Sequence, residues 1–167
     1  MKYKSISLFI LALAAVFGTA ADKPKVEVDA AKLTWKIGQP RSLKAVRGIL
    51  GNELVPEKGM ILVAVPLTYT APKDTSENAV AQISTKSFVL FTKPKGEYSS
   101  SAINTRVEPA EEGWIIPPAQ NESVTTTINV GKNRTEAFFL AFVVPSGTAS
   151  AELRLATTPL GICVLPK

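Results

Sequence analysis

Three glutamates and a tryptophan are the residues of this sequence whose types and spacing could support chemistry. Glu108, Glu111 and Glu112 lie within five positions, and Trp114 follows shortly after them. Paired carboxylates can act as the acid and the base of glycoside hydrolysis, and a nearby aromatic ring can stack on a sugar. Neighbouring residues of an extended chain point in opposite directions, so Glu111 and Glu112 face one substrate only where a turn folds them together. A solvated loop is the favoured interpretation, and a catalytic pair is the alternative.

The two tryptophans could instead form an aromatic surface for binding. Trp35 alternates with the apolar Leu33 and Ile37, and this period of two places all three on the core face of a strand. Trp114 precedes two isoleucines, and we expect it to cover one end of the fold. Use of either ring as a binding platform is the alternative.

Cys163 is the single cysteine of the chain and lies in the apolar stretch 160–165. A cysteine in such surroundings behaves as a small hydrophobic residue. A cysteine nucleophile would need a histidine or another cation to lower the pKa of its thiol. The sequence therefore predicts a buried thiol, with a disulfide to another chain as the alternative.

Composition excludes most catalytic and metal-binding arrangements. The chain has 167 residues, of which 46% are hydrophobic, and it contains no histidine, one cysteine and three aspartates. This length suits one domain with a sizeable core. A Ser-His-Asp triad or a histidine-ligated zinc needs histidine, and a calcium loop needs several carboxylates. We therefore expect no catalytic, cofactor-binding or metal-binding residue, no bound cofactor and no enzymatic activity.

The first 21 residues have the pattern of a secretory signal peptide. Lys2 and Lys4 precede the apolar run 6–17, and the small residues 18–21 precede a charged segment that begins at Asp22. A membrane anchor is the alternative, but this run of twelve residues is shorter than the roughly 20 residues that span a bilayer. The sequence predicts a signal peptide at 1–21, one mature domain at 22–167 without a membrane span, and a secreted or periplasmic location.

The charge of the mature chain argues against nucleic acid as a partner. Loss of Lys2 and Lys4 lowers the formal net charge from +5 to +3. The remaining basic residues favour the first third of the chain, where acidic residues separate them. Nucleic-acid binders typically carry a concentrated basic stripe with aromatic residues among it. We expect no nucleic-acid partner.

Alternating apolar and polar residues predict strands. The segment 60–70 has large apolar residues at the odd positions from Ile61 to Tyr69, so one of its faces meets a core. Pro66 lacks an N–H group and favours an edge position or a bulge there. The segment 137–144 is apolar on both faces and predicts a central buried strand that ends at Pro145.

The remaining strands are weaker, and together they predict the fold class. Strands are expected at 87–92, 123–130 and 149–155, with further candidates at 25–29, 33–37, 113–116 and 162–165. Residues 74–84 are polar and predict a loop, while 39–48 could hold a helical turn. Short strands without a long amphipathic helix predict an all-β, immunoglobulin-like antiparallel β-sandwich.

The motifs follow one another in a familiar order. A long strand begins at 59–63 with Gly-Met-Ile-Leu-Val, the Phe-Val-Leu strand at 88–90 leads to Gly-Glu-Tyr at 96–98, and an apolar strand ends in Val144-Pro145 before an amphipathic strand at 152–155. This order resembles a bacterial telokin-like, immunoglobulin-like family of exported domains and lipoproteins of unassigned function. The resemblance covers roughly 26–155 and implies no catalytic residue. Many members carry a lipidation cysteine, which this chain lacks.

Taken together, these features favour an exported, non-enzymatic β-sandwich that acts by binding or structural association. We expect a monomer whose partner is a protein or a glycan. One alternative is a carbohydrate-binding or adhesion module that uses Trp114 and its neighbouring loops. Another is a small hydrolase that acts through Glu108, Glu111 or Glu112.

The signal peptide makes a direct prediction about the mature N-terminus. We expect exported material to begin at Asp22, with Ala21 as the alternative, because small residues border the charged chain at this point. N-terminal sequencing of exported protein checks this. Recovery of membrane-embedded protein that still carries Met1 would contradict it.

Overall fold

A computed structural model describes residues 24–92, 96–106, 111–119, 122–132 and 134–166. The predicted signal peptide at 1–21 and Glu108 lie outside these ranges. The described residues form fifteen strands and two short 3-10 turns, Ala30–Lys32 and Thr85–Ser87. The strands are β1 (Val26–Glu27), β2 (Thr34–Ile37), β3 (Arg41–Leu43), β4 (Val46–Gly48), β5 (Glu53–Leu54), β6 (Met60–Thr70), β7 (Ala79–Ser84), β8 (Phe88–Thr92), β9 (Gly96–Ser99), β10 (Ala102–Asn104), β11 (Glu112–Trp114), β12 (Thr125–Asn129), β13 (Thr135–Pro145), β14 (Ser150–Leu155) and β15 (Thr158–Val164).

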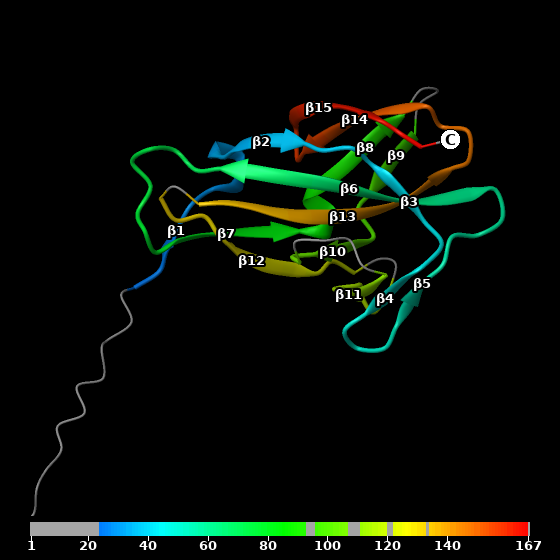
Figure 1. Cartoon of the computed structure of the whole chain (residues 1–167), viewed down its shortest axis with the longest axis horizontal. Helices are drawn as coiled ribbons and strands as arrows, with labels where there is room; N and C mark the ends of the chain where they lie inside the picture. Colours follow the sequence, from blue (N-terminus) through cyan, green and yellow to red (C-terminus); the bar gives the residue numbers. More distant parts are fainter. Residues whose placement is uncertain (1–23, 93–95, 107–110, 120–121, 133, 167) are drawn as a thin grey trace, which may run out of the picture.

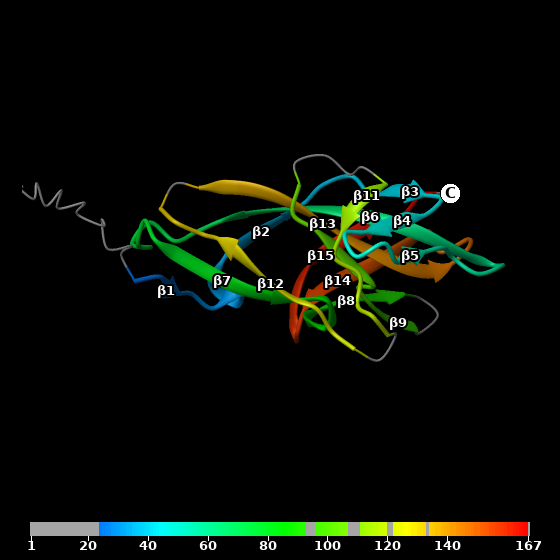
Figure 2. The same ribbon diagram turned by 90° about the horizontal axis from the view of Figure 1, so that it is seen from below.

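The strands form a β-sandwich with an additional small sheet (Figures 1 and 2). The central sheet has the order β10-β13-β6-β2, and β3 also pairs with β6. Two sheets, β1-β7-β12 and β15-β14-β8-β9, pack on one face of it and share a single core with it. The small sheet β11-β4-β5 packs on the opposite face. The prediction of an all-β sandwich is confirmed.

Strands β6 and β13 form the longest ladder of the fold. They are antiparallel and pair at every position from Met60 opposite Pro145 to Thr70 opposite Thr135. Both strands lie inside the central sheet, which confirms the central buried strand predicted at 137–144. The side chains of Val63, Val65, Phe142 and Leu153 belong to one core, as the alternation in the sequence predicts.

The segment 60–70 is buried on both faces along part of its length, although its pattern predicts only one buried face. Odd positions face the main core, where Val63, Val65 and Leu67 have no exposed surface. Leu62 and Ala64 on the other face are also buried, because the small sheet covers them. A second core therefore lies between the central sheet and β11-β4-β5.

Pro66 lies within a central strand and pairs with Phe139 in regular register, so the prediction of an edge position or a bulge is wrong. The N–H of Gly38 donates to the carbonyl of Pro66 at 2.8 Å, so the backbone polar groups of Pro66 face the side of β2 and β3. On that side β2 ends at Ile37 and β3 begins at Arg41. The missing N–H of the proline thus falls at a gap in the neighbouring strand.

Two other segments differ from the sequence expectation. The loop predicted at 74–84 is wrong in its second half, where β7 places the small side chains of Ala79 and Ala81 in the main core. The helical turn considered at 39–48 is wrong, because this segment forms β3 and β4. Small or mixed side chains give a weak periodic signal, and pairing with distant strands decides the structure of both segments.

The remaining predicted strands are confirmed with shifts of their ends, the largest at β15, which begins four residues before the candidate at 162–165. β8, β12 and β14 lie within 87–92, 123–130 and 149–155, and the weaker candidates correspond to β1, β2, β11 and β15. Within the described ranges, no helix is long and apolar enough to cross a membrane.

The register of these strands can be tested by placing a charge on each face. Val63→Asp buries an unpaired carboxylate in the main core and should cost more than about 3 kcal/mol of unfolding free energy. Thr127→Asp lies on the exposed face of β12 and should cost about 1 kcal/mol or less. Denaturant melts of the two variants check this, and equal losses would contradict the register.

Candidate functional site

An exposed apolar hairpin is the most distinctive surface feature of the described residues. Strands β4 and β5 are antiparallel neighbours and enclose the turn Ile49–Asn52. Ile49 is 63% exposed and Leu50 is 82% exposed, and Val55 just beyond β5 is 57% exposed. Single exposed hydrophobic residues are common, but two adjacent ones at the end of a projecting turn form a patch. We call Ile49 and Leu50 the hairpin tip.

Glycine and asparagine set the shape of this turn. Gly48 N–H donates to the carbonyl of Asn52 at 2.6 Å, and Gly51 N–H donates to the carbonyl of Gly48 at 3.0 Å. A Cβ at Gly48 would lie 1.9 Å from Oδ1 of Asn52, so a side chain there would displace Asn52. Gly51 has φ of +82°, a conformation that glycine adopts without strain. The turn therefore holds Ile49 and Leu50 in a defined position.

Strand β11 anchors the hairpin along its length. Arg47 N–H donates to the carbonyl of Glu111 at 2.6 Å, and Ile49 N–H donates to the carbonyl of Trp114 at 2.9 Å. The side-chain amide of Asn52 donates to the carbonyl of Ile116 at 3.3 Å. The backbone at the tip is thus hydrogen-bonded to the neighbouring strand and is held against it.

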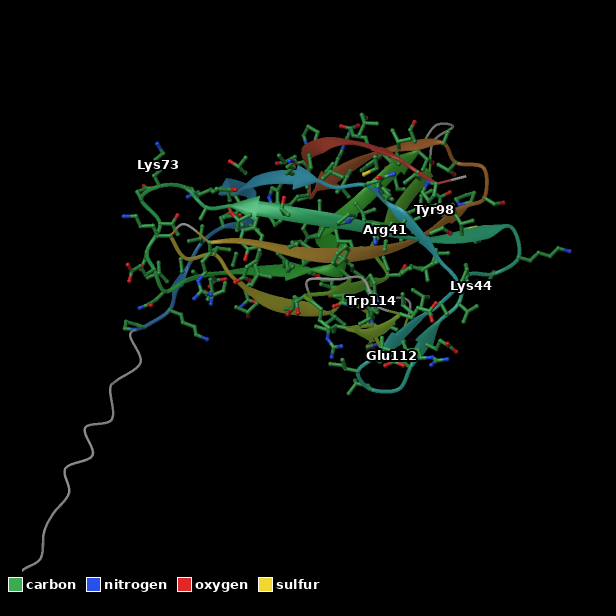
Figure 3. The ribbon with its side chains drawn as sticks, in the orientation of Figure 1. Arg41, Lys44, Lys73, Tyr98, Glu112 and Trp114 are labelled. Atoms are coloured by element: carbon green, nitrogen blue, oxygen red, sulfur yellow. The ribbon has the colours of Figure 1, made fainter. Side chains whose placement is uncertain are left out.

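Trp114 secures this small sheet to the body of the protein. Its side chain has no exposed surface and belongs to the second core with Val46, Leu62 and Phe139. In Figure 3 it lies nearer the body of the sandwich than Glu112, which lies at the outer edge. A buried ring offers no face to a sugar, so the burial of Trp114 argues against the alternative in which it is a binding platform. Trp114 is instead a packing residue beneath the hairpin.

A buried asparagine also holds β11 in place. Asn104 of β10 has no exposed surface, its side-chain amide donates to the carbonyl of Glu112 at 3.4 Å, and its Oδ1 accepts from Arg106 N–H at 2.9 Å. Gly113 has φ of +84°, and a Cβ there would meet the guanidinium of Arg106 at 2.7 Å. Asn104 and Gly113 together fix the irregular pairing of β11.

The alternative of a catalytic pair gains no support from Glu111 and Glu112, the two glutamates of this group that the structure describes, because both are exposed at the small sheet. Glu112 is exposed and pairs with Arg47 at 3.7 Å, while Arg47 also contacts Glu53 at 3.3 Å. Glu111 is also exposed and contributes its backbone carbonyl to the pairing with β4. Surface ion pairs of this kind contribute about 0–1 kcal/mol. These charges surround the base of the hairpin tip.

The other residues that the sequence singled out are packing residues. Cys163 is buried, as predicted, and burial raises the pKa of its thiol to about 11. Trp35 is partly buried and makes edge-to-face contacts with Tyr69, Phe88 and Phe138 at 5.7–5.8 Å between ring centres. Its indole N–H donates to the carbonyl of Ala30 at 3.0 Å. In the part of the chain that the structure describes, no cluster of three or more potential metal ligands occurs.

Two hollows lie beside the 3-10 turn Ala30–Lys32 and the end of β14. One of about 180 Å³ is lined by Trp35 and Leu160, and one of about 470 Å³ is lined by Glu27 and Asp29, with Leu155 shared between them. Asp29 uses its carboxylate to accept the N–H of Ala31 at 2.9 Å, which caps a 3-10 turn. The carboxylate of Asp29 thus serves the local structure.

Sequence reasoning missed the hairpin tip. The local signal was the turn pair Gly51-Asn52 beside two large aliphatic residues. From the sequence alone, two adjacent aliphatic residues such as Ile49 and Leu50 are expected to be buried. Only the pairing of β4 with β11 and β5 places the pair outside the core.

Comparisons with known proteins add little to this picture. No family model matches the chain, and no curated protein matches it. A solved structure of similar outline is that of an uncharacterized beta-sandwich protein from Clostridium difficile 630, with 10% sequence identity and a TM-score of 0.43. The match covers 86% of this chain and 96% of that chain. We draw no functional conclusion from this likeness, and the resemblance to the telokin-like family stays a prediction.

The anchoring role of Trp114 can be tested by truncation. Trp114→Ala should lower the free energy of unfolding by about 3–5 kcal/mol, because it opens a cavity in the second core. It should also speed hydrogen exchange at the amide of Ile49, which is bonded to β11. Trp114→Phe should retain most of both properties. Exchange at Ile49 that matches wild type in a folded Trp114→Ala variant would contradict the anchoring role.

Proposed function

We propose that this chain is an exported, non-enzymatic β-sandwich that binds a partner protein by inserting the hairpin tip into an apolar site. The observation that carries the proposal is the 82% exposure of Leu50 on a turn that is hydrogen-bonded to the sheet behind it. An apolar projection gains free energy when a partner removes it from water.

The size of this gain suits a binding contact. Complete burial of an aliphatic side chain is worth about 1.5–3 kcal/mol, so Ile49 and Leu50 together can supply a substantial part of the free energy of a micromolar complex. The hydrogen bonds from Arg47 and Ile49 to β11 fix the backbone before binding. A fixed conformation reduces the entropy that binding costs.

The residues around the tip suit a protein partner. Arg47, Glu53 and Glu112 place both signs of charge at the base of the hairpin. An apolar centre with a polar rim is the usual composition of a protein interface. A glycan partner is less well supported, because Ile49 and Leu50 have no aromatic face and Trp114 is buried.

Export and the absence of catalysis rest on other features. The N-terminal pattern of Lys2 and Lys4, an apolar run and small residues supports passage through a secretory pathway. The separate roles of Glu111 and Glu112 in the small sheet support a binding function over hydrolysis.

The proposal can be tested by photo-crosslinking in the source cells. A photoreactive amino acid at position 50 should give a discrete covalent adduct with one partner protein, because this position enters the partner. The same amino acid at position 127, on the exposed face of β12, is the control and should give none. Adducts are identified by mass spectrometry.

A substitution at Leu50 tests whether the complex depends on this side chain. The Leu50→Asp protein should no longer bind the partner that crosslinking identifies, because a charged side chain cannot enter an apolar site. Its unfolding free energy should change by about 0.5 kcal/mol or less, because the residue is exposed. Wild-type binding of the partner by the Leu50→Asp protein would contradict the proposal. Equal yields of adduct at positions 50 and 127 would also contradict it.

A further inference from the structure

Strand β15 is an exposed edge of the sandwich. It pairs with β14 alone at the end of the sheet β15-β14-β8-β9. Leu165 N–H donates to the carbonyl of Ala149 at 2.9 Å, so Leu165 and Cys163 direct their backbone groups toward β14. In an antiparallel strand the alternate residues point the opposite way. The N–H and C=O groups of Ile162 and Val164 therefore face outward from the sheet.

The same two residues expose large apolar side chains. Ile162 is 65% exposed and Val164 is 73% exposed, while Cys163 between them is buried. The strand thus offers outward hydrogen-bonding groups and apolar side chains at the same positions. This combination is a template for pairing with another strand.

Most of the other edge strands carry features that oppose such pairing, and the uncharged edge strand β10 is buried. Strands β1, β2, β3 and β9 each contain one charged residue, and β12 exposes threonine and asparagine side chains; the charged residues are Glu27, Lys36, Arg41 and Glu97. Charged side chains on an edge are a common protection against strand pairing. β15 contains no charged residue.

We propose that β15 pairs with β15 of a second copy of this chain, antiparallel and across a two-fold axis that passes through Cys163. In this register Ile162 of each copy lies opposite Val164 of the other, twice. Each of these pairs exchanges two backbone hydrogen bonds and places two apolar side chains side by side. The sheets of the two copies then continue into each other.

A second copy fits this edge for electrostatic reasons. Residues near a two-fold axis face their own equivalents, so a charge there would meet a like charge. The strand is uncharged, and behind it Glu152 and Arg154 of β14 neutralise each other at 2.9 Å.

The local shape also fits a short paired segment. Pro159 and Pro166 bound the free edge at its two ends and limit the ladder to the residues between them. A hollow of about 350 Å³ lies between this strand and the segment 37–40. An interface this short buries little surface, and interfaces of small area are typically weak. We therefore expect a dissociation constant between about 1 µM and 1 mM.

Sedimentation equilibrium of the purified protein tests the proposal. The weight-average mass should rise from monomer to dimer with concentration, and Val164→Lys should weaken the dimer at least tenfold by placing like charges across the axis. Leu50→Lys is a matched control, because it adds the same charge at an exposed apolar residue on another surface, and it should leave the dimer unchanged. A monomer at 1 mM, or a dimer that Val164→Lys does not weaken, would overturn the proposal. Loss of the dimer in Leu50→Lys alone would also overturn it and would assign self-association to the hairpin tip.

Amide hydrogen exchange provides an independent readout of the strand that pairs. The amides of Ile162 and Val164 should exchange more slowly at concentrations where the dimer forms. The amide of Thr127, which points away from β7 on the edge strand β12, should exchange at the same rate at all concentrations. Unchanged exchange at Ile162 and Val164 in a sample that is dimeric by sedimentation would overturn the proposed pairing.

Discussion

The ladder between β6 and β13 is the constraint on which the rest of the structure depends. Eleven residues of each strand pair without interruption, and side chains from both faces of the ladder are buried. The main core lies on one face and the second core on the other. A slip of one residue would exchange the two sets of side chains and disrupt both cores. The register of this pair therefore determines where every other layer can pack.

The second core explains why the hairpin tip projects from a firm base. The small sheet β11-β4-β5 covers the outer face of the ladder, and Trp114 fills the space between them. Backbone hydrogen bonds then tie Arg47 and Ile49 to β11. The position of the exposed Leu50 therefore depends on the packing of the small sheet against β6 and β13. The proposed binding function depends on the same packing.

Most strands of the main core could be predicted from the sequence, because large apolar residues such as Val63 and Leu153 recur on one face of each strand. Strand β7 could not, because its small side chains Ala79 and Ala81 give a weak periodic signal. The small sheet could not be assembled from the sequence, although the candidate strand at 113–116 corresponds to β11. Its strands are two or three residues long, too short for periodicity to identify. The burial of Trp114 and the exposure of Leu50 both depend on which distant segments pair with each other. Local sequence patterns do not predict such pairing.

The central claim is that the hairpin tip is a rigid apolar projection, and backbone ¹⁵N relaxation tests it most directly. If hydrogen bonds to β11 fix the turn, the amides of Ile49 and Leu50 should have order parameters of about 0.85, the value of rigid backbone. Residues Val63 and Val65 of β6 provide the reference in the same sample. Order parameters below about 0.6 at Ile49 and Leu50, with rigid values in β6, would contradict the account.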